Sequence, residues 1–109
     1  EKTVGVEGSS IYLEKGEVLT VKELLYGLML RSGNDCAETL AIHCSSSIED
    51  FAKLMNKKAK EIGATNSNFV NPHGLHDDNH YTTAYDMYLI FNEALKYEKF
   101  VEICLLCHI

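Results

Sequence analysis

A helix-start signal followed by an almost continuous apolar run is the feature that most constrains how this chain can fold. Thr20 and Glu23 have the spacing of a capping box, in which each side chain bonds the backbone N–H of the other residue. The positions after Glu23 read Leu-Leu-Tyr-Gly-Leu-Met-Leu, so the predicted helix has almost no polar face. Such a helix is normally covered on several sides. We therefore expect it to pack against protein beyond these 109 residues.

Further helices are predicted wherever a cap residue precedes apolar positions at helical spacing. Asn34 or Asp35 begins the second helix, Ser47 begins the third and Thr83 the fourth, and the last helix spans residues 98–106. No internal repeat or low-complexity segment interrupts this pattern. The chain is predicted to be mainly α-helical and to form a single unit.

Two stretches lack helical spacing. Residues 11–13 alternate between apolar and polar positions, which predicts a short extended segment, and Lys15-Gly16 then predicts a turn. Residues 64–82 are rich in asparagine and predict an ordered loop with a short extended piece at 68–70.

The composition excludes several classes of function. The chain carries 10 Lys and Arg against 16 Asp and Glu, a net charge of −6, which disfavours a nucleic-acid partner. Its 46% hydrophobic content is too high for a disordered chain. It has neither a signal-peptide pattern nor the roughly 18 consecutive apolar residues of a membrane span. We expect any contact with a membrane to be made only by segments outside these residues.

The cysteines predict neither a disulfide framework nor a haem site. Cys36 and Cys44 lie about 12 Å apart along one predicted helix, beyond the reach of a disulfide. Cys104, Cys107 and His108 fit the C-x-x-C-H pattern of covalent haem attachment. Two small apolar side chains on one helix face are the more common explanation of that spacing. We expect no cofactor.

A cluster of histidines offers a second candidate site. His73, His76 and His80 are spaced three and four residues apart beside Asp77 and Asp78, a set of side chains that could hold zinc. A polar surface loop explains the same residues, and motif matches of this kind often mislead. We therefore expect no metal here.

Ser32-Gly33-Asn34 joins the first predicted helix to the second. A serine and an asparagine two residues apart on a glycine turn can direct a hydroxyl and a carboxamide to one point. Taken alone, the triplet is more often an ordinary loop in which Asn34 caps the next helix.

The surrounding sequence favours a functional interpretation of the triplet over an ordinary loop. Residues 24–37 read Leu-Leu-Tyr-Gly-Leu-Met-Leu-Arg-Ser-Gly-Asn-Asp-Cys-Ala, which closely resembles the serine D-alanyl-D-alanine carboxypeptidases, the low-molecular-mass penicillin-binding proteins. The resemblance runs in order from about residue 9 to about residue 103, through the segments 51–59, 62–69, 71–75 and 80–87. Agreement over so long a stretch makes chance a poor explanation.

The resemblance implies a fold and a set of missing parts. Residues 1–109 would be one helix-rich subdomain of the β-lactamase/transpeptidase-like α/β fold, with the flanking sheet portions missing. Ser32-Gly33-Asn34 matches the second of the three motifs of this group, whereas S-x-x-K and K-T-G are absent. The chain alone is therefore expected to be inactive.

The resemblance also implies roles for the turn. Ser32 and Asn34 would be catalytic: Ser32 relays a proton to the departing D-alanine, and Asn34 positions the absent lysine and hydrogen-bonds the substrate amide. Ser32, Gly33 and Asn34 would together bind the substrate, a peptidoglycan stem peptide, with Gly33 keeping the turn tight. β-Lactams would act as inhibitors, and the whole protein would work outside the cytoplasmic membrane, in the cell envelope.

Two alternatives remain open. A serine β-lactamase shares the three-motif scheme, although Met55-Asn56 and Pro72-His73-Gly74-Leu75 favour the carboxypeptidase. A standalone helical bundle that binds a protein partner or a metal is the non-enzymatic alternative.

Overall fold

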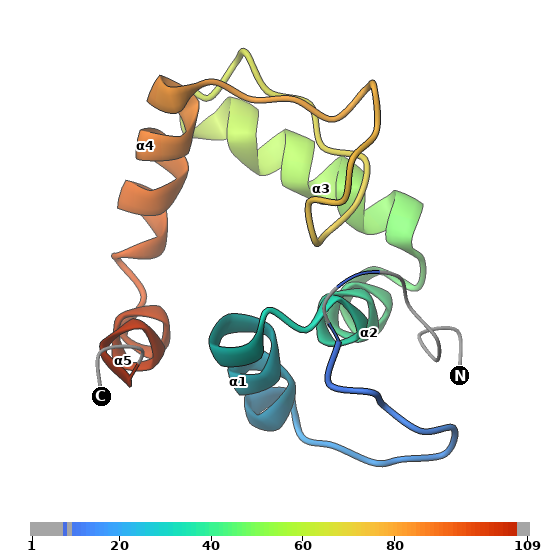
Figure 1. Cartoon of the computed structure of the whole chain (residues 1–109). Coiled ribbons are helices and arrows are strands. Elements are labelled where there is room, and N and C mark those ends of the chain that lie inside the picture. Colours follow the sequence, from blue (N-terminus) through green and yellow to red (C-terminus); the bar gives the residue numbers. More distant parts are fainter. Residues whose placement is uncertain (1–7, 9, 107–109) are drawn as a thin grey trace.

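The computed structural model describes residue 8 and residues 10–106, and these residues form a mainly helical arrangement (Figure 1). The helices are α1 (Val21–Arg31), α2 (Asn34–Ser45), α3 (Ile48–Glu61), α4 (Ala84–Ala94) and α5 (Glu98–Leu106). The mainly α-helical prediction is thus confirmed, and α5 has the predicted bounds. None of the helices in the described part of the chain is long and apolar enough to cross a bilayer.

Three helices begin at the predicted caps. Thr20 and Glu23 form both hydrogen bonds of the capping box at the start of α1. Ser47 caps α3 by accepting a hydrogen bond from a backbone N–H in its first turn, and Thr83 caps α4 in the same way. Each hydroxyl satisfies one of the N–H groups that a helix start leaves unpaired.

Helix α2 begins at Asn34, as predicted, but its cap differs from the prediction. Asn34 and Asp35 are its first residues, and the cap is Gly33, which offers no side-chain hydrogen bond. The Asp35 carboxylate accepts the Cys36 N–H instead, at 2.9 Å, so it compensates one of the unpaired N–H groups from inside the first turn.

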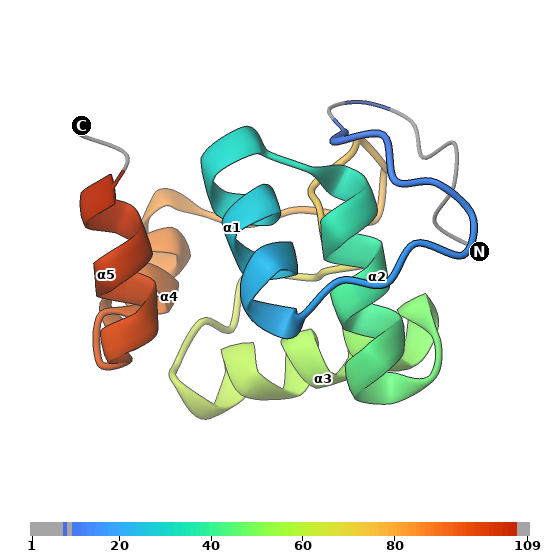
Figure 2. The same cartoon turned by 90° about the horizontal axis from the view of Figure 1, so that it is seen from below.

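The helices pack around α1 and α2. Helix α1 contacts α2 and α5, and α2 also contacts α3 (Figures 1 and 2). Gly27 lies at a close approach of α1 to α2, because a Cβ built on it would lie 2.7 Å from Cys36 Sγ. A larger residue there would force the Cys36 side chain or one of the helices to shift.

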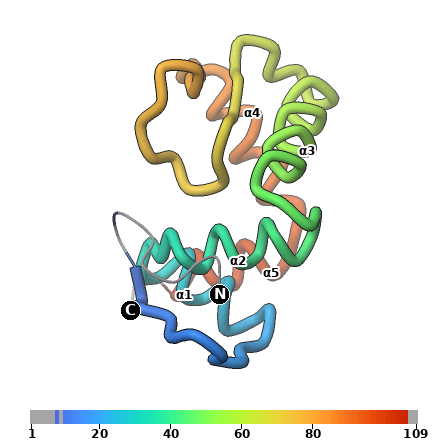
Figure 3. The backbone as a smooth tube through the Cα atoms, turned by 90° about the vertical axis from the view of Figure 1, so that its right-hand side faces the viewer, coloured from blue at the N-terminus to red at the C-terminus, as the bar shows by residue number. Residues whose placement is uncertain are grey.

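The 64–82 loop is ordered, as predicted, and it folds back alongside α3 toward α2 (Figure 3). Its extended piece is a single antiparallel bridge between Asn68 and Tyr81. Asp86 anchors the loop to α4: its carboxylate, only 1% exposed, accepts the Asn66 N–H at 2.8 Å and the Ser67 hydroxyl at 2.6 Å.

The prediction of an extended segment at residues 11–13 is wrong. Tyr12 adopts a left-handed conformation with φ 59°, whereas the turn at Lys15-Gly16 is present. The reason lies in the hydrogen bonds, since the Ile11 and Leu13 N–H groups both reach the Asp35 carboxylate. N–H groups two residues apart in a strand are separated by about 6.6 Å, too far for one carboxylate to accept both.

Large apolar surfaces remain exposed in the described part of the chain. Leu24 is the one buried leucine of α1, and Cys44 of α2 is exposed. An apolar groove of about 550 Å³ runs between α3, α4 and α5. Its walls include Phe51, Leu54, Met87 and Phe100. Exposed apolar area of this extent is unusual for a monomeric soluble protein.

We expect Asp86→Ala to lower the free energy of unfolding by about 2–4 kcal/mol, because the Asn66 and Ser67 donors lose their buried acceptor. Asp78→Ala is the matched control, since that aspartate is exposed and contacts only the equally exposed His76. Chemical denaturation of both variants measures the difference. Equal effects of the two substitutions would contradict the anchoring role of Asp86.

Candidate active site

The turn between α1 and α2 has an unusual backbone. Ser32 ends α1 in the left-handed region, with φ 53° and ψ 38°. The Gly27 carbonyl accepts hydrogen bonds from the N–H groups of both Ser32 and Gly33. A non-glycine residue in this region costs on the order of 1 kcal/mol, and such strain is concentrated at functional sites. Ser32 is exposed to solvent at this point of strain.

Gly33 is surrounded closely on three sides. A Cβ built on it would lie 3.1 Å from Asp35 Oδ1 and 3.2 Å from both Cys36 Sγ and the Gly27 carbonyl oxygen. These contacts are tighter than a side chain normally makes, so any larger residue would push the turn outward. The lack of a side chain at Gly33 fits a connection in which only Ser32 and Gly33 separate α1 from α2.

Asn34 lies deeper than Ser32. It is 8% exposed and lies against Gly8, because a Cβ built on Gly8 would lie 2.5 Å from Asn34 Nδ2. Leu75 also lies next to Gly8, with its Cδ2 3.1 Å from the same Cβ position. The turn therefore carries an exposed hydroxyl and a buried carboxamide two positions apart in the sequence. A hollow of about 320 Å³ has Ser10, Ile11 and Arg31, the last residue of α1, in its wall.

The buried carboxylate of Asp35 ties this turn to the N-terminal segment. Its two oxygens accept hydrogen bonds from the Ser10 hydroxyl at 2.8 Å and from the N–H groups of Ile11, Leu13 and Cys36 at 3.2, 3.0 and 2.9 Å. Burial raises the pKa of this carboxyl, but these bonds outweigh burial and hold the pKa below its ordinary value. The charge is stabilised by donors rather than by a cation.

Cys36 is fully buried next to this carboxylate. Burial, and then the negative charge of Asp35 and its hydrogen bond, raise the pKa of the thiol to about 11. The thiol thus stays protonated at neutral pH and acts as a small packing group against Gly27.

The histidines of the 64–82 loop do not converge. His73 contacts Glu38, His76 contacts Asp78, and His80 Nδ1 accepts the Val70 N–H. Within residue 8 and residues 10–106, no group of three or more potential ligands is arranged to hold a metal ion. In the haem-like pattern, Cys104 is a free thiol, and Cys107 and His108 lie outside the described residues.

The sequence matches a known family over almost its whole length. The family model described as D-alanyl-D-alanine carboxypeptidase, peptidase S11, covers residues 1–104. The chain is 50% identical over 98 residues to D-alanyl-D-alanine carboxypeptidase DacF of Bacillus subtilis, a match that spans 90% of this chain and 25% of the relative. The chain belongs to this family and spans about a quarter of the length of that relative.

Solved structures agree with this assignment. D-alanyl-D-alanine carboxypeptidase DacD of Francisella tularensis superposes with a TM-score of 0.86 at 37% identity, over 94% of this chain and 24% of that one. Penicillin-binding protein D2 of Listeria monocytogenes, in its ampicillin-bound form, superposes with a TM-score of 0.70 at 30% identity, over 83% and 38%. The five helices are a helical subdomain of the penicillin-binding protein fold.

Sequence reasoning missed two sets of polar contacts at this site. Asp35 was considered only as a helix cap, and its partners lie 22 to 25 residues away, at a separation that no local pattern reveals. The pairing of Glu38 with His73 spans 35 residues.

We expect Asp35→Asn to weaken the dependence of stability on acid. Because the folded-state pKa is depressed, the ionised carboxylate stabilises the fold fully above about pH 4, and this contribution is lost as the pH falls further. The difference in unfolding free energy between the unsubstituted protein and the variant should therefore shrink between pH 6 and pH 3. Denaturant titrations across that range test this, and a constant difference would contradict it.

Proposed function

We propose that this chain is the helical part of the catalytic domain of a serine D-Ala-D-Ala carboxypeptidase, which removes the terminal D-alanine from peptidoglycan stem peptides. The match of residues 1–104 to the family is the observation that carries the proposal. The strained, solvent-exposed Ser32 next to Asn34 supports it, since it presents a hydroxyl at the point where the family motif requires one.

The nucleophile would come from the rest of the protein. In residues 1–109 no serine is followed three positions later by lysine, and there is no Lys-Thr-Gly. A serine outside these residues would attack the carbonyl between two D-alanines, after its proton passes to the lysine of the same motif. The bond to the last D-alanine then breaks, and an acyl-enzyme forms.

Ser32 and Asn34 would have different roles in this acylation step. The Ser32 hydroxyl would pass a proton to the amine of the departing D-alanine, so that the leaving group is neutral. Asn34 would hydrogen-bond the lysine and the substrate amide, which fixes both in the geometry of attack. Water then hydrolyses the ester, releases the shortened stem peptide and regenerates the serine.

The site would also take β-lactams, because a strained cyclic amide that mimics D-Ala-D-Ala acylates the same serine. The relative from Listeria monocytogenes, solved in its ampicillin-bound form, supports this. Action on peptidoglycan requires that the whole protein work outside the cytoplasmic membrane. The names of the relatives favour a carboxypeptidase over a β-lactamase.

We expect Ser32→Ala in the full-length protein to lower kcat for D-alanine release by about 10²–10⁴-fold, the range of a lost general acid. Ser46→Ala is the matched control, because Ser46 is also an exposed serine in a left-handed C-cap, at the far end of α2. A D-alanine release assay on a D-Ala-D-Ala peptide compares the two. Unchanged turnover in Ser32→Ala would exclude the proton relay.

We also expect residues 1–109 alone to form no covalent adduct with a fluorescent penicillin, since the acylated serine lies outside them. The full-length protein should be labelled under the same conditions. Gel fluorescence measures both, and stable labelling of the isolated chain would place the nucleophile within these residues.

A further inference from the structure

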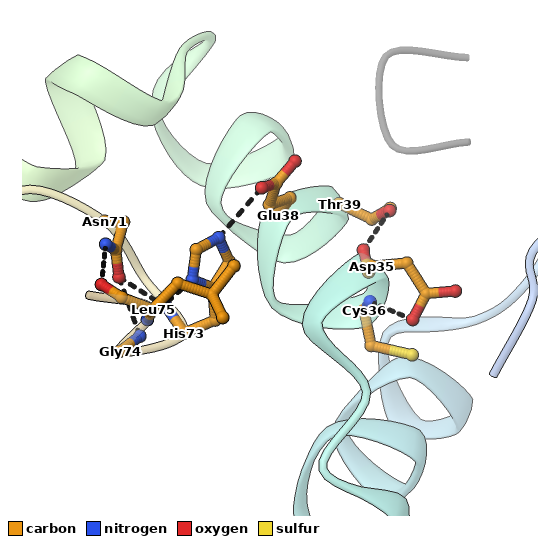
Figure 4. A network of polar contacts seen from close by, with 8 residues as sticks. All are labelled: Asp35, Cys36, Glu38, Thr39, Asn71, His73, Gly74 and Leu75. Carbon is orange, nitrogen blue, oxygen red and sulfur yellow. Dashed lines mark hydrogen bonds and ion pairs between the residues drawn. The ribbon is translucent and has the colours of Figure 1, made fainter. Parts of the chain in front are cut away.

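A largely buried pair of side chains joins the 64–82 loop to the helix that carries Asn34. His73 Nε2 lies 2.9 Å from Glu38 Oε2, and the two side chains are only 6% and 16% exposed (Figure 4). Their counterpart in the same loop, His76 with Asp78, is almost fully exposed. This difference in exposure between the two pairs matters, because removing one member of a largely buried pair leaves the other without its hydrogen-bond partner and shielded from water.

The turn that carries His73 is held rigidly. Asn71 Oδ1 accepts the N–H groups of His73 and Gly74 at 3.2 and 2.7 Å, and Asn71 Nδ2 donates to the Leu75 carbonyl at 2.9 Å. Gly74 has φ +91°, a conformation that glycine adopts without strain. Residues 71–75 therefore move as one body, which we call the 71–75 turn.

The contact of the other ring nitrogen of His73 shows which atom is the donor in the His73–Glu38 hydrogen bond. The Leu75 N–H points to His73 Nδ1 at 3.3 Å, and a backbone N–H can only donate. Nδ1 is thus the acceptor, so Nε2 carries the ring hydrogen and donates it to the Glu38 carboxylate. The His73 ring therefore links Glu38 of α2 directly to the backbone N–H of Leu75.

The same turn reaches α2 a second time, at Asn34. Glu38 follows Asn34 by four residues and shares its face of the helix. Leu75 and Asn34 both lie next to Gly8, since a Cβ built on Gly8 would lie 3.1 Å from Leu75 Cδ2 and 2.5 Å from Asn34 Nδ2. A shift of the 71–75 turn would therefore change the immediate surroundings of the Asn34 carboxamide.

We propose that Glu38 and His73 are a positioning pair that seats the 71–75 turn on α2 and thereby orients the Asn34 carboxamide. This inference rests on the proposed function of Asn34. Neither residue touches the reacting atoms; both act through Leu75 on the surroundings of Asn34. A displacement of about 1 Å in such a supporting element can slow a reaction by about 100-fold.

Two substitutions of similar size separate the hydrogen bond from packing. In the full-length protein, Glu38→Gln keeps an oxygen that accepts the Nε2–H, whereas Glu38→Met fills the space without an acceptor. We expect Glu38→Met to lower kcat/KM for a D-Ala-D-Ala peptide about 10-fold or more, and Glu38→Gln to stay within about 3-fold of the unsubstituted enzyme. The double variant Glu38→Met with His73→Gln should be no slower than Glu38→Met alone.

The controls separate positioning from loss of stability. Thr20→Ala removes the capping box at the far end of α1 and provides a destabilised reference, and His76→Ala removes the exposed pair of the same loop. Thermal unfolding of each variant is measured beside its kinetics. If Glu38→Met is no slower than Thr20→Ala, or Glu38→Gln is as slow as Glu38→Met, the positioning role is overturned.

The outcome also distinguishes the two proposals. If the full-length protein releases no D-alanine, or Ser32→Ala is fully active, the proposed function fails and the positioning role falls with it. If Ser32→Ala is inactive while Glu38→Met matches the unsubstituted enzyme, the proposed function stands and only the positioning role is overturned.

Discussion

The carboxylate of Asp35 is the constraint on which the rest of this structure depends. A buried negative charge without a cation is costly, and here hydrogen bonds from one hydroxyl and three backbone N–H groups compensate it. Three of these donors belong to residues 10–13, which form no regular secondary structure. The charge therefore imposes order on a segment that has little order of its own, and it does so next to the Ser32-Gly33-Asn34 turn.

Two irregular segments of the chain bind to α2 within its first two turns. Asp35 binds the N-terminal segment. Glu38 binds the 71–75 turn, as Figure 4 shows. Asn34 precedes both and lies against Gly8, which in turn lies next to Leu75. A short stretch of one helix thus gathers parts of the chain that are far apart in sequence around a single carboxamide.

Local rules predicted the helices well because the information is local. The caps at Thr20, Ser47 and Thr83 and the bounds of the last helix follow from side chains and backbone groups within three or four residues of one another. The family resemblance singled out the Ser32-Gly33-Asn34 turn, which spacing alone would have left as an ordinary loop. The fold class was therefore accessible from the sequence.

The contacts that shape the candidate site were not accessible in this way. Tyr12 is left-handed because its two neighbours share an acceptor that lies more than 20 residues further along the chain. Glu38 and His73 are likewise 35 residues apart in sequence. In both cases the contact is tertiary, and the spacing of residues contains no information about such a contact.

The burial of Cys36 supplies an internal reporter on this region. Its thiol is enclosed where α1 crosses α2. Its raised pKa also leaves almost no thiolate at neutral pH. Alkylating reagents therefore cannot modify Cys36 while the two helices stay together. Cys44 is exposed on the same helix and reacts regardless of that state. The ratio of the two alkylation rates therefore measures how often the interface between α1 and α2 opens, without any added label.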